Sequence, residues 1–549
     1  MTCWLHRPFV AVPVLWVAAA HVGPLLAVAR ISLLDAYPAA PGAAVVLDGH
    51  AYAAFLGGPG YRAALGHSLW VAAAATGIAL VLTWPLAWHV AVEVPPAQRA
   101  RRLALLIAPF WTSEVLRMFA LVLLLANRGA LNAVLRWAGL ADAPVPLLYG
   151  TGAVLAGIIY TVLLTMLLPV YAALDRLPRD LLDAAADLGA GPWRRQGLIV
   201  LPLVAGGIAP GVALTFLLCL GMLAAPALLG GAGTPAFAAV IAGFFGGASG
   251  RWPMGGGVQP RAARGGNGLR RRPRLGRQGA EHARRVGTAS RVSLGRLVAT
   301  CYWIAVLALM LPLGLIVLTG LTDATLVGFP LGRPSLRWHA AALADPANAR
   351  ALLLSLALAA ASAALAVAAG TWIALAAGFL RPGWRWLLLA GALVPLATPG
   401  IVHAIALRIA IRAVGLDPGP FAVLLGHVVH ATPLAALMAG ARLATLPPEL
   451  VEAAQDLGAG PVGAFWLVKL PWLGRTLIGA ALLAALNSFD DFVRSFFLGG
   501  YEPTLPVLIF GRLRSGLTPE INALATLALL EAGAIGAALA WLARARPAA

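Results

Sequence analysis

Charge is scarce along this chain, and lysine is almost missing. Only 11% of the 549 residues are charged and 60% are hydrophobic, whereas a soluble protein carries about 25% charged residues. Lys469 is the single lysine, and it stands between Val468 and Leu470. A phosphate-binding P-loop needs a lysine between glycine and serine or threonine. The composition excludes an ordinary soluble domain, and we predict no enzyme, no ATPase site and no catalytic residue in this chain.

Cysteine is scarce as well. Cys3, Cys219 and Cys301 are isolated, so no pair has metal or redox spacing. His427 and His430 are three residues apart, a spacing compatible with a metal pair, but neither has an acidic or cysteine partner nearby in the sequence. We therefore expect no metal site, and we expect both histidines to form core or interhelical hydrogen bonds.

Long apolar runs are what the sequence has in abundance. About 20 such residues cross a bilayer, and a backbone surrounded by lipid must be helical. The first run is too long for a secretory signal and is followed by a further span, so we expect it to be a span. The predicted fold class is an all-α polytopic membrane protein. The expected spans are Pro8–Leu34, Ala64–Val92, Leu103–Ala126, Gly150–Leu174, Leu198–Leu223, Leu297–Leu318, Ala351–Leu380, Trp386–Ile409, Phe421–Ala441, Thr476–Phe497 and Ile521–Leu542.

One loop is written twice. Residues 177–202, "LPRDLLDAAADLGAGPWRRQGLIVLP", return 269 positions later as residues 446–471, "LPPELVEAAQDLGAGPVGAFWLVKLP", with 14 of 26 positions identical. Each copy is followed by an apolar run that ends in a glycine pair, Gly230–Gly231 and Gly499–Gly500. Such a repeat predicts two related parallel halves with a pathway at their interface. We place the halves at residues 1–250 and 297–549.

Arginine positions orient the chain, because loops rich in Lys and Arg face the cytoplasm. Both copies of the loop lie on the arginine-rich side and are predicted to be cytoplasmic. The residues that carry this prediction are Arg99, Arg101, Arg102, Arg176, Arg179, Arg194, Arg195, Arg381, Arg385, Arg442, Arg544 and Arg546.

The segment between the halves, residues 251–296, breaks the pattern. It holds 12 arginines and one acid, Glu281. One interpretation is a basic linker or a patch for anionic lipid heads; nucleic-acid binding is not expected, since no fold or aromatic set supports it. The other interpretation rests on parity: five spans in the first half would invert the second, so a sixth is needed here. Out-of-frame translation of a GC-rich gene that once encoded an apolar helix would explain its loss.

The repeated loop predicts a helix–turn–helix elbow. Asp180 and Asp183 lie at the front of a short helix, where the helix dipole favours anions. Gly189 can end that helix, and Pro192 prevents its continuation. A second short helix then leads into the next span. The alanine pairs, Ala184–Ala185 and Ala453–Ala454, leave a low-relief surface suited to a partner's groove.

These elbows resemble the "EAA" coupling loop of the permeases of binding-protein-dependent ABC importers. The matching positions are Asp183 (in place of Glu), Ala184, Ala185, Gly189, Leu201 and Pro202, and again Glu452, Ala453, Ala454, Gly458, Leu470 and Pro471. The resemblance implies that each elbow docks on one subunit of an ATPase dimer. It implies that ATP and Mg²⁺ bind that partner and that this chain holds no cofactor.

Two further stretches narrow the resemblance. "PFWTSEVLRMFALVLLLANRGALNAVL" is similar to the first permease of spermidine/putrescine importers, and "NSFDDFVRSFFLGG" to the second. The resemblance implies a fusion of two six-span permease halves in the bacterial inner membrane, fed by an extracytoplasmic substrate-binding protein. A ferric-iron or thiamine permease and an ion-driven secondary transporter remain as alternatives.

Acids at membrane depth are the candidates for contact with the substrate. Glu114, Asp490 and Asp491 could replace water around the ammonium groups of a polycation. The plainer interpretation is a local ion pair at helical spacing, Glu114 with Arg117 or Asp491 with Arg494. Glu531, inside the last run, is expected to be an interhelical partner.

Overall fold

The computed structural model describes residues 3–35, 46–231, 233–245, 287–329, 331–516 and 518–544. These residues form helices, with two isolated β-bridges and no strand. Ten of the described helices are long and apolar enough to cross a bilayer, or eleven if one bent pair counts as a span. The prediction of an all-α, multi-pass membrane protein is confirmed.

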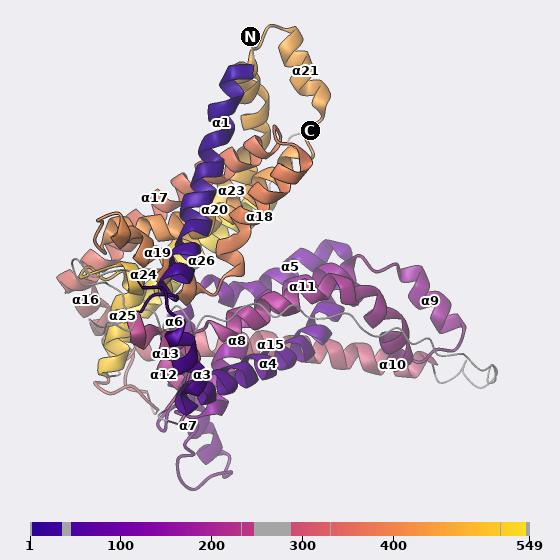
Figure 1. The fold of residues 1–549 in the computed structure, drawn as a ribbon. Helices are drawn as coiled ribbons and strands as arrows, with labels where there is room; N and C mark the ends of the chain where they lie inside the picture. Colours follow the sequence, from indigo (N-terminus) through magenta and orange to yellow (C-terminus); the bar gives the residue numbers. More distant parts are fainter. Residues whose placement is uncertain are drawn as a thin grey trace.

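The helices form two arms that diverge from a common junction (Figure 1). The first arm contains α4 (Pro59–Trp88), η2 (His89–Glu93), α5 (Pro96–Ile107), α8 (Thr151–Asp175), α9 (Arg179–Asp187), α10 (Pro192–Arg195), η4 (Gln196–Val200), α11 (Leu201–Leu220) and α15 (Gly287–Gly320). The second arm contains α1 (Cys3–Trp16), η1 (Val17–Val22), α17 (Pro346–Ala377), α18 (Pro382–Ala397), α20 (Pro420–Leu443), α21 (Pro448–Asp456), α22 (Pro461–Ala464), η5 (Phe465–Lys469) and α23 (Leu470–Asp490).

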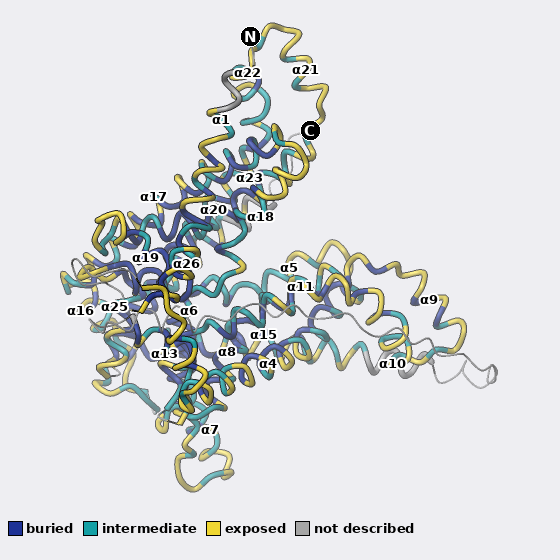
Figure 2. The backbone as a smooth tube through the Cα atoms, viewed as in Figure 1, coloured by how far each residue is buried: buried dark blue, intermediate teal, exposed yellow. Residues whose placement is uncertain are grey.

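The junction joins short helices from both halves. One apolar core there contains Phe119 from the first half together with Phe492 and Phe510 from the second, and Figure 2 shows buried residues through the junction and along the inside of both arms. The junction helices are α2 (Gly23–Ile31), α3 (His50–Gly57), η3 (Ala108–Trp111), α6 (Glu114–Leu125), α7 (Ala130–Trp137), α12 (Ala224–Leu229), α13 (Phe237–Phe245), α16 (Arg337–Ala344), α19 (Gly400–Ala413), α24 (Phe492–Leu498), α25 (Leu505–Ser515) and the start of α26 (Pro519–Arg544).

The first long helix of each half packs on the other half. α15 lies against α4 and α6, and its Leu309 carbonyl accepts a 2.7 Å hydrogen bond from the Tyr160 hydroxyl. In the other direction, η1 and α2 pack on α18 and α19, and the Trp372 indole donates to the Phe9 carbonyl at 2.8 Å. This exchange ties the halves together, and sequence pattern gave no sign of it.

Two expected spans are broken. The run Leu103–Ala126 leaves α5 at Ile107, passes through η3 and starts again as α6, and the run Trp386–Ile409 bends by 110° between α18 and α19. Ser113 and Pro399, the residues that precede α6 and α19, have extended backbones. Proline lacks the N–H that would continue a helix, and Pro109 and Pro399 fall at the two breaks. The prediction of a single continuous helix in each run was therefore wrong.

The helix–turn–helix form of the elbows is confirmed. α9 and α21 each end at a glycine of positive φ, Gly189 at +81° and Gly458 at +87°. The next amide bonds back into the helix in both copies, from Ala190 to the Ala185 carbonyl and from Ala459 to the Ala454 carbonyl, each at 2.9 Å. Both elbows lie at the ends of the arms away from the junction (Figure 1).

The described residues that flank the arginine-rich segment lie at opposite ends of α4. The Phe244 ring is 5.7 Å from that of Tyr61, near the start of α4, whereas the Tyr302 ring is 5.1 Å from that of His89, just past its end. A helix of this length spans about 45 Å. A sixth crossing of the bilayer between Phe244 and Tyr302 would place them at opposite ends in this way. The two interpretations of residues 251–296 fall mostly on positions 246–286, outside the described residues, although α15 already begins at Gly287.

We predict that Gly458→Ala loosens the second elbow. An L-residue in the left-handed region costs about 1–2 kcal/mol, so local opening should increase about fivefold or more. Hydrogen exchange of residues 448–460 in the purified chain measures this. Gly474→Ala is the matched control, because a side chain there meets open space at ordinary φ. Unchanged exchange in Gly458→Ala would contradict the proposed strain.

Candidate functional site

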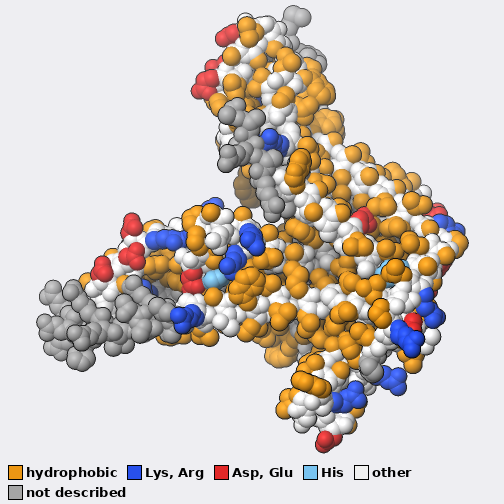
Figure 3. All heavy atoms as spheres, turned by 180° about the vertical axis from the view of Figure 1, so that it is seen from behind, with side chains coloured by type: hydrophobic (Ala, Val, Ile, Leu, Met, Phe, Trp, Pro, Cys, Tyr) orange, Lys and Arg blue, Asp and Glu red, His pale blue; other side chains and the backbone are white. Residues whose placement is uncertain are grey.

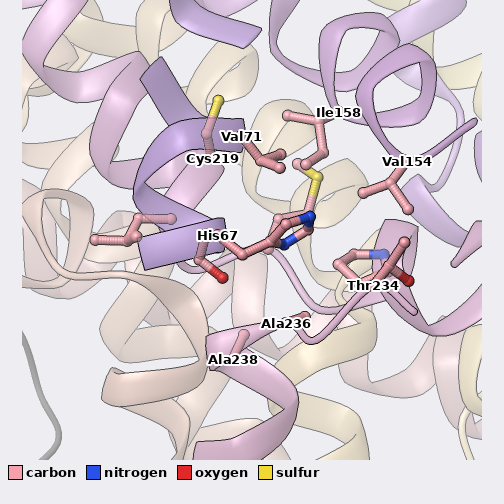
Figure 4. A pocket seen from close by; sticks show the side chains of 12 residues that line it. His67, Val71, Val154, Ile158, Cys219, Thr234, Ala236 and Ala238 are labelled. Carbon is pink, nitrogen blue, oxygen red and sulfur yellow. The ribbon is translucent and has the colours of Figure 1, made fainter. Parts of the chain in front are cut away.

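A cavity of about 280 Å³ lies between the halves. Its walls come from α6, α8 and the end of α11 in the first half, and from the α18–α19 break, α20, α23 and α24 in the second. Two smaller cavities measure about 20 and 10 Å³. The larger of these, lined by His67, Cys219 and Thr234 (Figure 4), holds about one water molecule. The cavity between the halves is therefore the candidate passage.

Breaks in the spans bring charged side chains to this cavity. The break after Trp111 makes Glu114 the first residue of α6, and Arg117 follows one turn later. An acid is favoured at that end of a helix. In the second half, α23 ends at Asp490 and α24 begins after Asp491. All three candidate acids line the cavity.

Asp491 is held in a fixed network. Its Oδ1 accepts from the Arg494 amide at 2.9 Å, and its Oδ2 accepts from Arg494 Nη1 at 2.6 Å. The two side chains are 5% and 7% exposed, so the pair is buried. Arg494 Nη2 also donates to His430 Nδ1 at 2.9 Å. The ion pair expected between Asp491 and Arg494 is therefore present.

His427 and His430 form hydrogen bonds, as expected. The His427 ring nitrogens contact the Ser488 hydroxyl at 2.7 Å and the Ser495 hydroxyl at 3.1 Å, which joins α20 to α23 and α24. His430 accepts from Arg494. Both ring nitrogens of His427 and the Nδ1 of His430 are therefore engaged in interhelical hydrogen bonds.

Glu114 and Asp490 differ from Asp491, because neither forms an ion pair within 4 Å among the described residues. Glu114 Oε1 and Arg117 Nε are buried without a hydrogen-bond partner. The local pair expected between Glu114 and Arg117 is not formed, although its helical spacing equals that of Asp491 and Arg494. Glu531 is half-buried on α26 and also lacks an ion pair in the described part of the chain.

Corresponding positions of the two halves differ in charge at the cavity. Asp490 corresponds, 269 residues earlier, to Gly221, where a side chain would collide with Pro399. Counted from the helix starts, Glu114 corresponds to Gly400 and Arg117 to His403. The buried His403 ring has no partner on either nitrogen. Counting from the breaks would have revealed this asymmetry, but apolar runs do not show where helices break.

The elbow residues are mostly exposed. Ala185 is buried against its own arm and Ala454 partly so; the exposed positions are Asp183, Ala184, Gly189, Pro202, Glu452, Ala453, Gly458 and Pro471. Leu188 and Leu457 follow directly after α9 and α21. They are 89% and 88% exposed. These leucines were not predicted as functional residues. The sequence feature that could have identified them is an identical apolar residue at the end of a polar helix in both copies.

Comparison with known proteins shows the family of this chain. Residues 60–319 match the family described as binding-protein-dependent transport system inner membrane component. The putrescine transport system permease protein PotI of Escherichia coli is 35% identical over 224 residues, which is 39% of this chain and 78% of PotI. The chain belongs to this family of permeases.

The chain is also similar to the spermidine/putrescine transport system permease protein PotB. The Escherichia coli protein is 38% identical over 174 residues, 32% of this chain and 63% of PotB. For PotB of Salmonella typhimurium the identity is also 38%, over 60% of its length. The chain thus spans about 60% of the length of these relatives, so their cargo is not transferred by similarity alone.

We predict that Asp491→Asn destabilises this permease and Asp490→Asn does not. Breaking a buried ion pair on one side costs about 3–5 kcal/mol, and asparagine keeps the helix cap. Asp490 has no such pair, so neutralising it should leave the melting temperature unchanged or raise it. Thermal unfolding of the purified variants in detergent measures both. An equal loss in the two would contradict the separate roles.

Proposed function

We propose that this chain forms the translocation pathway of an ATP-driven importer of polyamines in the bacterial inner membrane. The observation that carries the proposal is the cavity between two elbow-bearing halves, into which both halves supply an unpaired acid, Glu114 and Asp490. Membership of the permease family and the likeness to PotB and PotI support it. The permease itself is not the enzyme in this proposal.

The two elbows would pass on the motion of a partner. Each presents exposed small residues, with one leucine that is almost fully exposed, at the end of an arm. Between the arm ends and the junction, the surface in Figure 3 is mostly hydrophobic, as lipid contact requires. In this proposal ATP and Mg²⁺ bind an ATPase dimer. The dimer binds both elbows, and its motion brings the two arms together.

The opposite end would receive the cargo. The junction lies away from the elbows (Figure 1), and an extracytoplasmic substrate-binding protein would deliver a cation on that side. Ferric-iron and thiamine transport are not favoured, because PotB is named a spermidine/putrescine permease and PotI a putrescine permease. An ion-driven carrier would need neither elbow.

Uptake tests the proposal. Cells that express the chain with its ATPase and binding-protein partners should accumulate labelled putrescine or spermidine, and an inactive ATPase should abolish accumulation. Uptake that persists without the ATPase and follows an ion gradient would favour the secondary transporter. Uptake of ferric iron or thiamine but not of polyamines would overturn the cargo.

A second prediction concerns docking. Leu188→Asp and Leu457→Asp should each reduce co-purification of the ATPase about tenfold or more, because burying a leucine contributes about 1.5–3 kcal/mol. Leu140→Asp is the matched control: this leucine is 75% exposed but follows α7, on the junction side. If all three variants retain the ATPase equally, the elbows are not its docking surface.

A further inference from the structure

The cavity contains a charge arrangement that the transport of a cation does not by itself explain. Three acids and two arginines line it, so its formal charge is one negative. Asp491 and Arg494 neutralise each other directly. Glu114, Asp490 and Arg117 are left, and they form no ion pair within 4 Å among the described residues.

The two free carboxylates come from opposite halves. Glu114 begins α6 of the first half, and Asp490 ends α23 of the second. Carboxylates out of water cost several kcal/mol each unless a cation compensates them. Because each carboxylate belongs to a different half, any change in the separation of the halves changes the distance between Glu114 and Asp490.

Arg117 is a cation close to both, but engaged with neither. Its guanidinium carbon lies 5.3 Å from the centre of the Phe110 ring, and its side chain is buried, with an unpartnered Nε. It lines the same cavity as Asp490 and Glu114. An arginine side chain has enough rotatable bonds to move between a ring face and a carboxylate.

We propose that Arg117 is a tethered counter-ion, which neutralises Glu114 and Asp490 in the empty cavity and which the cargo's ammonium group displaces. A primary ammonium has three donors and can contact both carboxylates directly, and it then replaces Arg117, whose guanidinium lies over the Phe110 face, as their nearest cation. When the cargo moves on, Arg117 is again the nearest cation to both carboxylates, which disfavours rebinding. This role rests on the proposed function and specifies how its site releases a cation.

The rest of the cavity lining indicates the class of cargo. Where Glu114 and Asp490 would have counterparts, the cavity is lined by Gly400 and Gly221. Met222, Leu223, Pro395 and Leu396 are further apolar lining residues. One ammonium at the two carboxylates, with methylenes along these apolar residues, suits a linear primary amine that passes one charge at a time.

Equilibrium binding to the full chain, purified in lipid nanodiscs without the ATPase, tests the tethered counter-ion. Labelled putrescine and labelled ethylammonium are the probes. Arg117→Met should bind both at least tenfold more tightly than wild type, because the internal competitor is gone. Arg117→Lys should stay near wild type, since it keeps a cation. Asp490→Asn should lose binding in either background.

The matched control is Arg412→Met, which removes an exposed arginine on α19 away from the cavity and should leave binding unchanged. In transport, Arg117→Met should lower the maximal rate more than it changes KM, because release becomes slow. Equal or weaker binding in Arg117→Met, or a loss shared by Arg117→Lys, would overturn the proposal and indicate a structural arginine.

The two proposals fail in different ways. If the cargo is not a polyamine, wild-type cells will not accumulate putrescine, yet Arg117→Met will still bind ethylammonium more tightly. If Arg117 is not the counter-ion, wild-type uptake persists and removing the arginine gives no gain in binding of either probe.

Discussion

Lipid cannot solvate a charge, and this constraint determines where this permease keeps its ionised side chains. Within the described spans, the two buried arginines, Arg117 and Arg494, line the cavity where the two halves meet, together with three acids. Asp491 meets the constraint through its ion pair with Arg494, which also bonds His430. Glu114 and Asp490 have no such partner, and a passage for cations can use carboxylates left in that condition. The exchanged first helices matter here, because they hold together the two halves that supply the site.

The duplicated scaffold is used symmetrically at one end and asymmetrically at the other. At the elbows, corresponding positions are alike: Gly189 and Gly458 share a positive φ, and Leu188 and Leu457 share near-complete exposure. In the cavity, corresponding positions differ, as Gly221 does from Asp490. The likeness of the elbows fits the proposed docking on two copies of one ATPase subunit, whereas the unequal cavity fits the proposed passage of one ammonium group at a time.

Much of this architecture could be predicted from sequence, for local reasons. Apolar runs located the spans because length and composition alone decide whether a helix can cross lipid. The elbows were predictable because Gly189 ends a helix and Pro192 prevents its continuation, and both effects are local to the chain. The family resemblance rested on the same short-range pattern, and the relatives confirm it.

The rest depends on contacts that pattern does not encode. The breaks near Ser113 and Pro399 were missed, because an apolar run reads alike whether straight or bent. The packing of α15 on the opposite half was missed, because both partners are apolar all round. Equal i,i+3 spacing predicted two ion pairs, but only Asp491 and Arg494 formed one. Asp491 also caps its helix, and its partner Arg494 is held by a second bond to His430.

The topology that places both elbows with one motor is tested most directly by labelling single cysteines from one side of the membrane. Ala190→Cys and Ala459→Cys would be made in a chain whose Cys3, Cys219 and Cys301 are replaced, with Tyr501→Cys, a fully exposed junction position, as the reference. Both elbow cysteines should react with an impermeant maleimide only in inside-out vesicles, and Tyr501→Cys only in right-side-out vesicles. Elbow cysteines that react from opposite sides would contradict the parallel arrangement of the two halves.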